Sequence, residues 1–196
     1  MHPYSVDSSE HRVVPFFLAA LGILAALALS EALAWLNWTV PWWFDAPAAM
    51  GCYSLIYVTF DQYLWRIPVL HSLGVIKTPW LAGRWSVEIE SSFGERGDKH
   101  SADAEIRQTW ARIVIALETP YSRSHSTVAG IVPDAPSGPL VTYEYLNEPK
   151  SSAESGMHMH RGVARLRLTG DGRVLEGEYY SGRDRQNHGS LRLERR

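Results

Sequence analysis

The segment VTYEYLNEP, residues 141–149, places aromatic and amide side chains at every second position. Alternate side chains of a β-strand share one face, so Tyr143, Tyr145 and Asn147 would lie side by side. Tyrosine rings can stack on a flat ligand, and an asparagine amide can donate and accept hydrogen bonds at the edge of a base. The same face could equally be core packing, and the choice depends on what the other strands place beside it.

Other polar groups lie near the ends of predicted strands. Ser122 or Ser124 could hydrogen-bond a base edge, and Arg123 or Arg183 could pair with a phosphate. His160 follows another histidine by two residues, a spacing that suits a metal ion, but no third ligand has a recognisable spacing and the sequence has no G-x-S-x-G nucleophile motif. We therefore expect a protein that is not an enzyme, with no catalytic residue, no metal site and no cofactor.

The composition divides the chain into two parts. It has 196 residues, a formal net charge of -2 and one cysteine, Cys52, which excludes an internal disulfide framework. Most charged residues follow Leu81, and arginine outnumbers lysine there. Such a length accommodates one membrane anchor and one domain of roughly 100 residues or a little more. We expect the two parts to face different solvents.

The segment from Val13 to Leu36 is typical of a membrane-spanning helix. Its 24 residues carry one charge, Glu31. At about 1.5 Å per residue, such a helix crosses a hydrocarbon core of roughly 30 Å. A cleaved signal peptide is the alternative, because residues 32–34 resemble an A-x-A cleavage site. However, the apolar run exceeds the roughly 7 to 15 residues of a signal peptide, and Asp7 and Glu10 are unlike its basic start.

A second apolar run, residues 46–60, ends at Asp61 and then resumes as far as Ile76. The second helix either stops near Asp61, with the carboxylate among lipid headgroups, or carries an acid inside the membrane. A buried ionisable group costs about 2.5 to 3.5 kcal/mol on insertion scales and marks a polar partner or a water path. The turn between the runs is rich in tryptophan, which is typical of a membrane interface.

Basic residues set the expected topology. Arg12 precedes the first helix, and Arg66, Lys77 and Arg84 follow the second, whereas the turn between them has neither lysine nor arginine. The positive-inside rule then places both termini in the cytoplasm. The expected organisation is a cytoplasmic N-terminus (1–12), transmembrane helix 1 (13–36), a short periplasmic turn (37–45), transmembrane helix 2 with a juxtamembrane extension (46–70), a linker (71–81) and a cytoplasmic β-barrel (82–196).

Four residues of this hairpin could mediate self-association. Gly22 and Ala26 stand four apart, and such a face of small residues lets two helix backbones approach closely, although alanine is common in membrane helices for other reasons. Glu31 and Asp61 are acidic groups in or beside the apolar runs. We expect these four residues to act in oligomerisation within the membrane.

Beyond Trp80 the sequence changes to short alternating segments separated by turn residues, with no helical period of useful length. The predicted strands are residues 83–93, 105–118, 122–132, 140–147, 158–169, 173–181 and 188–194. We predict a membrane-anchored all-β protein: two N-terminal transmembrane helices followed by a small antiparallel, lipocalin-like β-barrel of about eight strands, because closure removes the sheet edges. An odd number would leave the first and last strands parallel, so we expect a further strand.

The segment 105–118 breaks the alternation that the other strands follow. Elsewhere parity places apolar side chains such as Leu166 inside and the neighbouring arginines in solvent. Here Gln108 and Trp110 fall out of phase with Ile113 and the apolar residues after it. A β-bulge near Ala111 or Arg112 would return both sets to the interior.

Antiparallel succession gathers the polar groups at one mouth of the barrel. The groups expected there are Thr119 to Ser124, Tyr145 to Asn147, His160, Tyr179 to Arg183 and Gly189. A barrel of about eight strands can hold one small ligand, and a polar mouth over an apolar floor suits such a ligand. Parity alone slightly favours a polar cluster that merely closes the barrel end.

An ordered set of short motifs resembles one known family. The motifs are D-x-x-L-W-R (61–66), G-x-W (83–85), Q-T-W (108–110), T-x-x-S-x-S (119–124), Y-x-Y-x-N-x-P (143–149), H-x-G (160–162), G-x-Y-Y (177–180) and H-G-S-L-R-L (188–193). With the two membrane helices, they resemble the SMODS-associating two-transmembrane, β-strand-rich effectors, the CD-NTase-associated membrane proteins of the antiphage system CBASS.

The resemblance implies a multi-pass sensor of the bacterial inner membrane. Its cytoplasmic barrel would bind a cyclic dinucleotide made by a partner CD-NTase, and no nucleic acid polymer is expected as a partner. Binding would drive self-association of the helices in the lipid bilayer, membrane disruption and abortive-infection cell death. The expected ligand contacts are Gln108, Trp110, Thr119, Ser122, Arg123, Ser124, Tyr143, Tyr145, Asn147, His160, Tyr179 and Arg183.

Two alternatives belong to other functional classes. A lipocalin-like, membrane-tethered barrel could carry or sense a fatty acid or haem, with His160 as an axial ligand. A purely structural membrane protein is the other alternative. A nucleotidyltransferase gene beside the gene for this chain would favour the effector over both.

Overall fold

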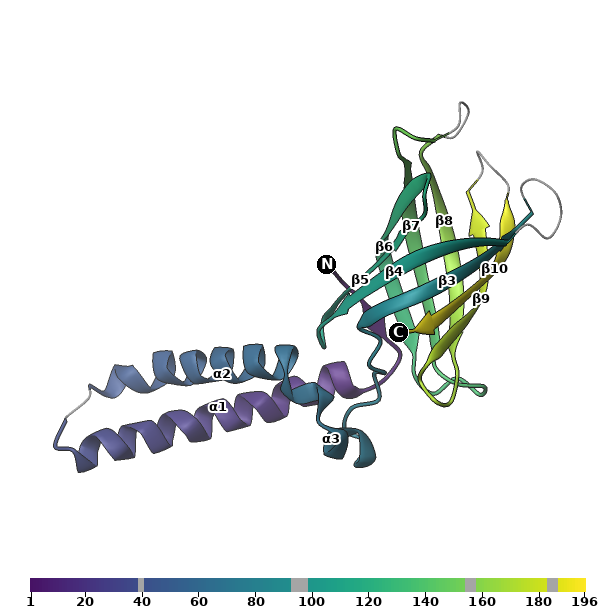
Figure 1. Ribbon diagram of the computed structural model, residues 1–196. Coiled ribbons are helices and arrows are strands. Elements are labelled where there is room, and N and C mark those ends of the chain that lie inside the picture. Colours follow the sequence, from purple (N-terminus) through teal and green to yellow (C-terminus); the bar gives the residue numbers. More distant parts are fainter. Residues whose placement is uncertain (39–40, 93–98, 154–157, 183–186) are drawn as a thin grey trace. The chain divides into compact units, whose positions relative to one another are not determined.

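The chain folds into two units, and the N-terminal residues belong to the second of them (Figure 1). The computed structural model describes residues 1–38, 41–92, 99–153, 158–182 and 187–196. Residues 8–77 form a helical unit, and residues 1–7 together with 78–196 form a β-unit. The first seven residues therefore belong to the barrel although the helices follow them in sequence.

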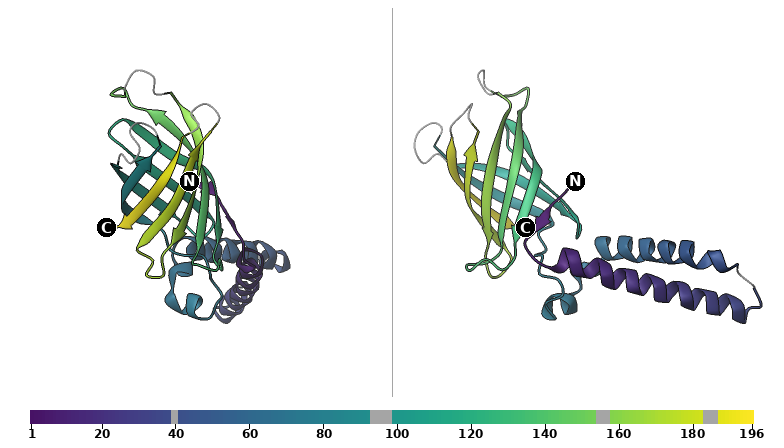
Figure 2. Two further views of the ribbon diagram at one scale, coloured as in Figure 1. Left: turned by 90° about the vertical axis from the view of Figure 1, so that its right-hand side faces the viewer. Right: turned by 180° about the vertical axis from the view of Figure 1, so that it is seen from behind.

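Two antiparallel helices make up most of the helical unit (Figure 2). Helix α1 spans Glu10–Trp35 and helix α2 spans Asp45–Gln62, with the 3₁₀ helix η1 (Trp42–Phe44) just before α2. Within the described residues, α1 is the one helix that is long and apolar enough to cross a membrane. The hydroxyl of Ser30 donates to the carboxylate of Asp45 over 2.7 Å and ties the end of α1 to the start of α2.

Helix α2 ends just after Asp61, which is one of the two possibilities that the sequence left open. After Gln62 come the 3₁₀ helix η2 (Leu64–Arg66) and the short helix α3 (Pro68–Ser72). Pro68 excludes the helical conformation at Ile67, whose ψ is 123°, and so begins a new helix. Asp61 lies in the last turn of α2 and is 9 % exposed. Its carboxylate accepts a hydrogen bond from the side-chain amide of Gln62.

The small residues of α1 pack against α2 within one chain. A Cβ atom at Gly22 would lie 2.9 Å from the Cα atom of Tyr53, so only glycine allows this approach. Ala26, one turn further, is 3 % exposed. A contact between two chains through the same face would require this hairpin to open. Glu31, in contrast, is exposed on α1.

A closed antiparallel barrel forms the β-unit, as the alternation predicted. In the described part of the chain the sheet has ten strands, of which β1 and β2 are short N-terminal strands and the other eight close on themselves. Strand β10 pairs with β3, and β5 pairs with β6. The barrel strands are β3 (Gly83–Ser91), β4 (Lys99–Gln108), β5 (Arg112–Glu118), β6 (Ser122–Val132), β7 (Leu140–Pro149), β8 (His160–Leu168), β9 (Val174–Ser181) and β10 (His188–Arg195).

The core follows the predicted parity. Trp85, Leu166 and Leu193 have no exposed surface, whereas Arg161 and Arg165 lie outside. The buried side chains of all eight strands meet in one cluster, because every second residue of each strand faces the barrel axis. This cluster fills the barrel below the end that carries the polar residues.

The prediction of one strand over residues 105–118 is wrong, because these residues belong to two strands. Strand β4 ends at Gln108 and β5 begins at Arg112. The N–H of Thr109 donates to the carbonyl of Arg112 over 2.8 Å, and the N–H of Arg112 donates to the hydroxyl of Thr109 over 3.1 Å. The expected bulge near Ala111 or Arg112 is therefore a hairpin turn, and this reversal supplies the missing strand.

The N-terminal residues also belong to the sheet. Strand β1 (His2–Pro3) pairs antiparallel with β5, and strand β2 (Ser5–Val6) pairs parallel with β6. The sequence predicted only a cytoplasmic N-terminus here, because a strand of two residues has no readable period. Figure 1 shows the N-terminus beside β5.

The packing of Gly22 can be tested with a matched pair of glycines. Gly22→Ala should lower the melting temperature of the hairpin, because overpacking against a backbone costs about 1 to 3 kcal/mol. Gly51→Ala in α2 is the control, since nothing lies within 4 Å of its Cβ position. Far-ultraviolet circular dichroism of the detergent-solubilised chain measures the melting temperatures of the two variants. Equal values would contradict the close approach of Gly22 to Tyr53.

Candidate functional site

A cavity of about 530 Å³ opens at one end of the barrel. Its volume lies within the roughly 300 to 1,000 Å³ of small-molecule sites. Each of the strands β3 to β10 contributes at least one residue to the lining. Ile89, Leu117 and Leu191 are apolar, and the rest of the lining is mostly polar or aromatic.

One wall of the cavity is aromatic. The ring centroids of Tyr143 and Tyr145 are 6.3 Å apart, and those of Tyr145 and His160 are 6.5 Å apart with the planes at 80°. Tyr143 is deepest, at 4 % exposure, and burial together with the neighbouring Tyr145 raises the pKa of its hydroxyl. The hydroxyl therefore stays neutral at physiological pH, and the wall presents uncharged ring surfaces.

Glycines on neighbouring strands position two of the tyrosines. Tyr145 lies opposite Gly162, and Tyr179 lies opposite Gly189. A Cβ atom at Gly162 would overlap the hydroxyl end of Tyr145, and one at Gly189 would lie 2.7 Å from the Cε1 atom of Tyr179. Each ring can thus lie across the bare backbone of the next strand, which keeps it on the wall of the cavity.

A row of polar side chains crosses the mouth. Ser124, Asn147 and His160 are register partners on β6, β7 and β8, and all three line the cavity. Asn147 is 8 % exposed, and no described residue hydrogen-bonds its side-chain amide. This amide lines the cavity and can donate and accept hydrogen bonds to a ligand there.

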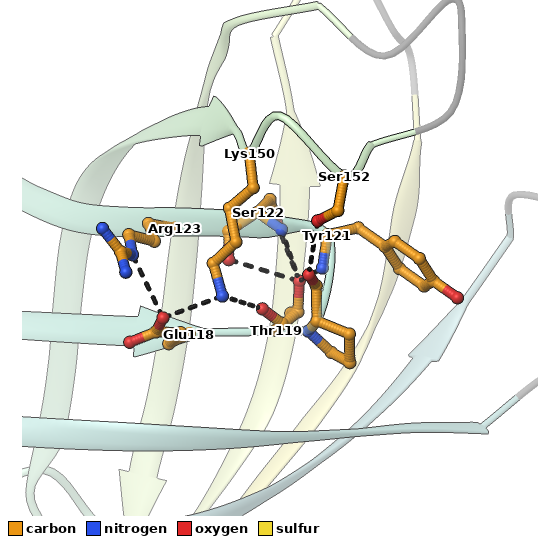
Figure 3. A network of polar contacts seen from close by, with 8 residues as sticks. Glu118, Thr119, Tyr121, Ser122, Arg123, Lys150 and Ser152 are labelled. Atoms are coloured by element: carbon orange, nitrogen blue, oxygen red, sulfur yellow. Dashed lines mark hydrogen bonds and ion pairs between the residues drawn. The ribbon is translucent and has the colours of Figure 1, made fainter.

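The side-chain hydroxyls of Thr119 and Ser122 stabilise the turn between β5 and β6 (Figure 3). The Oγ1 atom of Thr119 accepts hydrogen bonds from the N–H groups of Tyr121 at 3.2 Å and Ser122 at 2.9 Å, and the two hydroxyls of Thr119 and Ser122 are 3.0 Å apart. Lys150 donates to the carbonyl of Thr119 over 2.6 Å. The T-x-x-S part of the motif therefore shapes the rim of the cavity.

An exposed ion-pair network lies outside this turn, as Figure 3 also shows. Glu118 accepts from Lys150 at 2.8 Å and from Arg123 at 3.0 Å. Hydrogen bonds from Lys150 and then Arg123 hold the pKa of the Glu118 carboxyl below its ordinary value. The guanidinium of Arg123 is thereby held on the outer surface, away from the cavity.

Most of the predicted ligand contacts do line this cavity. They are Thr119, Ser122, Ser124, Tyr143, Tyr145, Asn147, His160 and Tyr179. Their contact with a ligand stays a prediction, but the structure brings them together around one space.

Four predicted contacts are not among the lining residues. Gln108 lies at the other end of the barrel, where its side chain accepts from the N–H of Leu81 at 2.8 Å and donates to the carbonyl of Pro79 at 3.1 Å. Trp110, in the β4–β5 turn, is 1 % exposed. Arg123 points outward, and Arg183 lies outside the described residues.

The sequence missed the lining that comes from β3 and β4. Ser91, Lys99 and His100 line the cavity, and Lys99 is the lysine among the described lining residues. His100 shares the inward phase of β4, whereas Lys99, the register partner of Glu90, lies at the rim in the outward phase.

Lys99 and His100 were missed because residues 99–108 were not recognised as a separate strand, which hid the return of the chain to this mouth. A hairpin turn in place of the bulge would have revealed these two residues. Ser91 was missed although the predicted strand 83–93 places it in phase with Ile89.

Comparisons with known proteins cover nearly the whole chain. Residues 76–195 match the family described as Cap15, cyclic dinucleotide receptor domain, and residues 12–66 match the one described as Cap15, TM helices. The chain is also similar to CD-NTase-associated protein 15 of Yersinia aleksiciae, with 33% identity over 189 residues that cover 93% of this chain and 88% of that protein. The first match contains the barrel and its cavity.

The seat of Tyr145 can be tested at the glycine beneath it. Gly162→Ala should displace the ring and destabilise the barrel by about 1 to 3 kcal/mol, because the new methyl group overlaps a packed side chain. Urea denaturation followed by tryptophan fluorescence measures this loss. Gly170→Ala, which meets nothing within 4 Å, is the control. Identical midpoints would show that Tyr145 does not lie across Gly162.

Proposed function

The chain belongs to the Cap15 family of CBASS effectors, and on that premise we propose that the barrel cavity is its binding site for a cyclic dinucleotide. The observation that carries the proposal is the cavity itself, which lies within residues that match the receptor domain. Its aromatic wall and polar row supply the two kinds of contact that nucleobases need.

The lining matches the parts of a cyclic dinucleotide. Tyr145 and Tyr179 offer ring faces on which bases can stack. Asn147 and Ser124 offer hydrogen bonds to base edges, and Lys99 offers a positive charge to a phosphate. A fatty acid chain would leave the amide of Asn147 without a partner, so this lining supports a polar, aromatic ligand.

We propose that both helices anchor the protein in the bacterial inner membrane, with the barrel and both termini in the cytoplasm. At 1.5 Å per residue, the 18 residues of α2 extend about 27 Å, close to the thickness of a hydrocarbon core. The positions of Arg12 and Arg66 support this orientation, because basic residues favour the cytoplasmic side.

The effector step proposed here is ligand-driven self-association. A ligand that binds the assembled form better than the monomer shifts chains toward assembly by that difference in affinity. Exposed Glu31 is the charged group of the apolar span that a second copy could contact. Membrane disruption and cell death would follow from assembly, and no catalytic step is required.

A nucleotide panel tests the ligand site. We expect at least one of the 3′,3′-linked cyclic dinucleotides of purines, pyrimidines or both to raise the melting temperature of the full chain in detergent. Asn147→Ala should weaken its binding roughly 5- to 150-fold, the equivalent of about 1 to 3 kcal/mol. Tyr145→Ala should cost a similar amount through lost stacking.

The matched control for this panel is Arg123→Ala. Arg123 was predicted from the sequence as a contact but pairs with Glu118 on the outer surface, so its variant should bind like the wild type. Stabilisation by no member of the panel would contradict the proposed function. Equal loss in all three variants would argue against this cavity as the site.

A second experiment separates binding from assembly. Glu31→Ala should abolish growth arrest in cells that also express an active CD-NTase, while the affinity of the purified chain for its nucleotide stays unchanged. Leu29→Ala, an exposed apolar position on the same helix, should retain the growth arrest. A Glu31→Ala chain that arrests growth as the wild type does would exclude Glu31 from the assembly.

A further inference from the structure

The barrel closes through an unusually short stretch of direct pairing. Strands β5 and β6 pair at three positions, Ala116 with His125, Leu117 with Ser124 and Glu118 with Arg123. Away from the mouth the same two strands pair instead with the N-terminal segment, residues 1–7. Ile113 of β5 pairs with His2, and Ile131 of β6 pairs with Val6. The N-terminal segment thus completes the seam between β5 and β6.

Side chains as well as backbone hold this segment in place. The N–H of Asp7 donates to the carbonyl of Ile131 over 2.9 Å. Tyr4 is 7 % exposed and belongs to the barrel core, and its hydroxyl lies 3.3 Å from both the carbonyl of Thr109 and the amide of Gln108. An edge strand that is covered in this way has satisfied backbone groups, so the segment stabilises the closed form.

Ser126 joins the segment to both sides of the seam. It lies on β6 at an irregularity in the β6–β7 register and is 3 % exposed. Its Oγ atom accepts from the N–H of Ile115 on β5 at 2.9 Å and is hydrogen-bonded to Nε2 of His2 at 2.8 Å. One hydroxyl therefore contacts β5, β6 and the N-terminal segment.

The other end of the same seam is the wall of the cavity. Leu117 from β5 and Ser124 from β6 are direct register partners, and both line the cavity. Ser124 is two residues from Ser126. A ligand that contacts both strands at the mouth would favour their pairing, and that pairing sets the spacing of the strands at the position of His2.

We propose that the N-terminal segment is a seam strand that couples the occupancy of the cavity to helix α1. This inference rests on the proposed function. A bound cyclic dinucleotide tightens β5 against β6 and thereby holds the segment in its seat. Only Ser8 and Ser9 separate Asp7 from Glu10, the first residue of α1, and these three Cα–Cα steps span at most about 11 Å, so the seated segment limits how far away α1 can begin.

Coupling of this kind is reciprocal. If the nucleotide stabilises the seated segment, the seated segment must raise the affinity for the nucleotide by the same factor. The connection on the other side of the hairpin is longer, since residues 73–82 lie between α3 and β3. The N-terminal connection is therefore the more direct route from the barrel to the membrane helices.

Hydrogen exchange measured by mass spectrometry tests the coupling on the full chain in detergent. The probe is whichever of cyclic di-GMP, cyclic di-AMP, cyclic di-UMP, cyclic GMP–AMP and cyclic UMP–AMP gives the largest thermal shift. We expect it to slow exchange of the peptide that contains residues 2–7 at least five-fold. His2→Ala and the milder Tyr4→Phe should each weaken binding of that nucleotide at least three-fold.

His125→Ala is the matched control, because only the backbone of His125 takes part in the β5–β6 pairing, while its exposed side chain hydrogen-bonds no described residue. Its variant should bind the nucleotide with wild-type affinity. A thermal shift without any change of exchange at residues 2–7, together with wild-type affinity in both seam variants, would overturn the coupling and leave the ligand site intact. Binding of no member of the set would overturn the proposed function and the coupling with it.

Discussion

Closure of the sheet between β5 and β6 is the constraint on which the rest of this fold depends. An open sheet would leave two rows of backbone donors and acceptors without partners, and the eight barrel strands remove those rows by pairing around a ring. Direct pairing between β5 and β6 is short, and the N-terminal strands β1 and β2 complete it. The barrel therefore consists of segments that precede and follow the helical hairpin in the sequence.

The shape of the cavity follows from this closure. All eight strands bring side chains to the same mouth, so their register decides which groups are neighbours. The row of Ser124, Asn147 and His160 exists because three successive strands are paired at those positions. Tyr145 and Tyr179 stay at the wall because glycines face them across the strands. The arrangement of the lining thus depends on backbone register as much as on side-chain identity.

The alternation of apolar and polar residues was the most informative pattern in the sequence of the barrel. Period-two patterns predicted the inward faces of the later strands, and therefore most of the cavity lining, because a strand presents alternate residues to opposite sides. The pattern failed at residues 105–118, where a turn without glycine or proline joins two strands and reads as one long strand with a slip in phase. The pairing of the N-terminal strands β1 and β2 with the barrel could not be predicted from the sequence, because a strand of two residues has no readable period. Arg123 lies between Ser122 and Ser124, which both line the cavity, so strand alternation itself turns Arg123 outward, where it pairs with Glu118.

The discontinuous barrel imposes an order on the biosynthesis of this protein. His2 and its partner Ser126 are separated by 124 residues, and both apolar segments lie between them. Ribosomes deliver the N-terminal residues first, yet their seat exists only after β5 and β6 have been made. The hairpin is thus synthesised before the barrel can close, and seating of the first residues belongs among the last steps of folding. A chain that stalls before that step would carry an open sheet edge between β5 and β6.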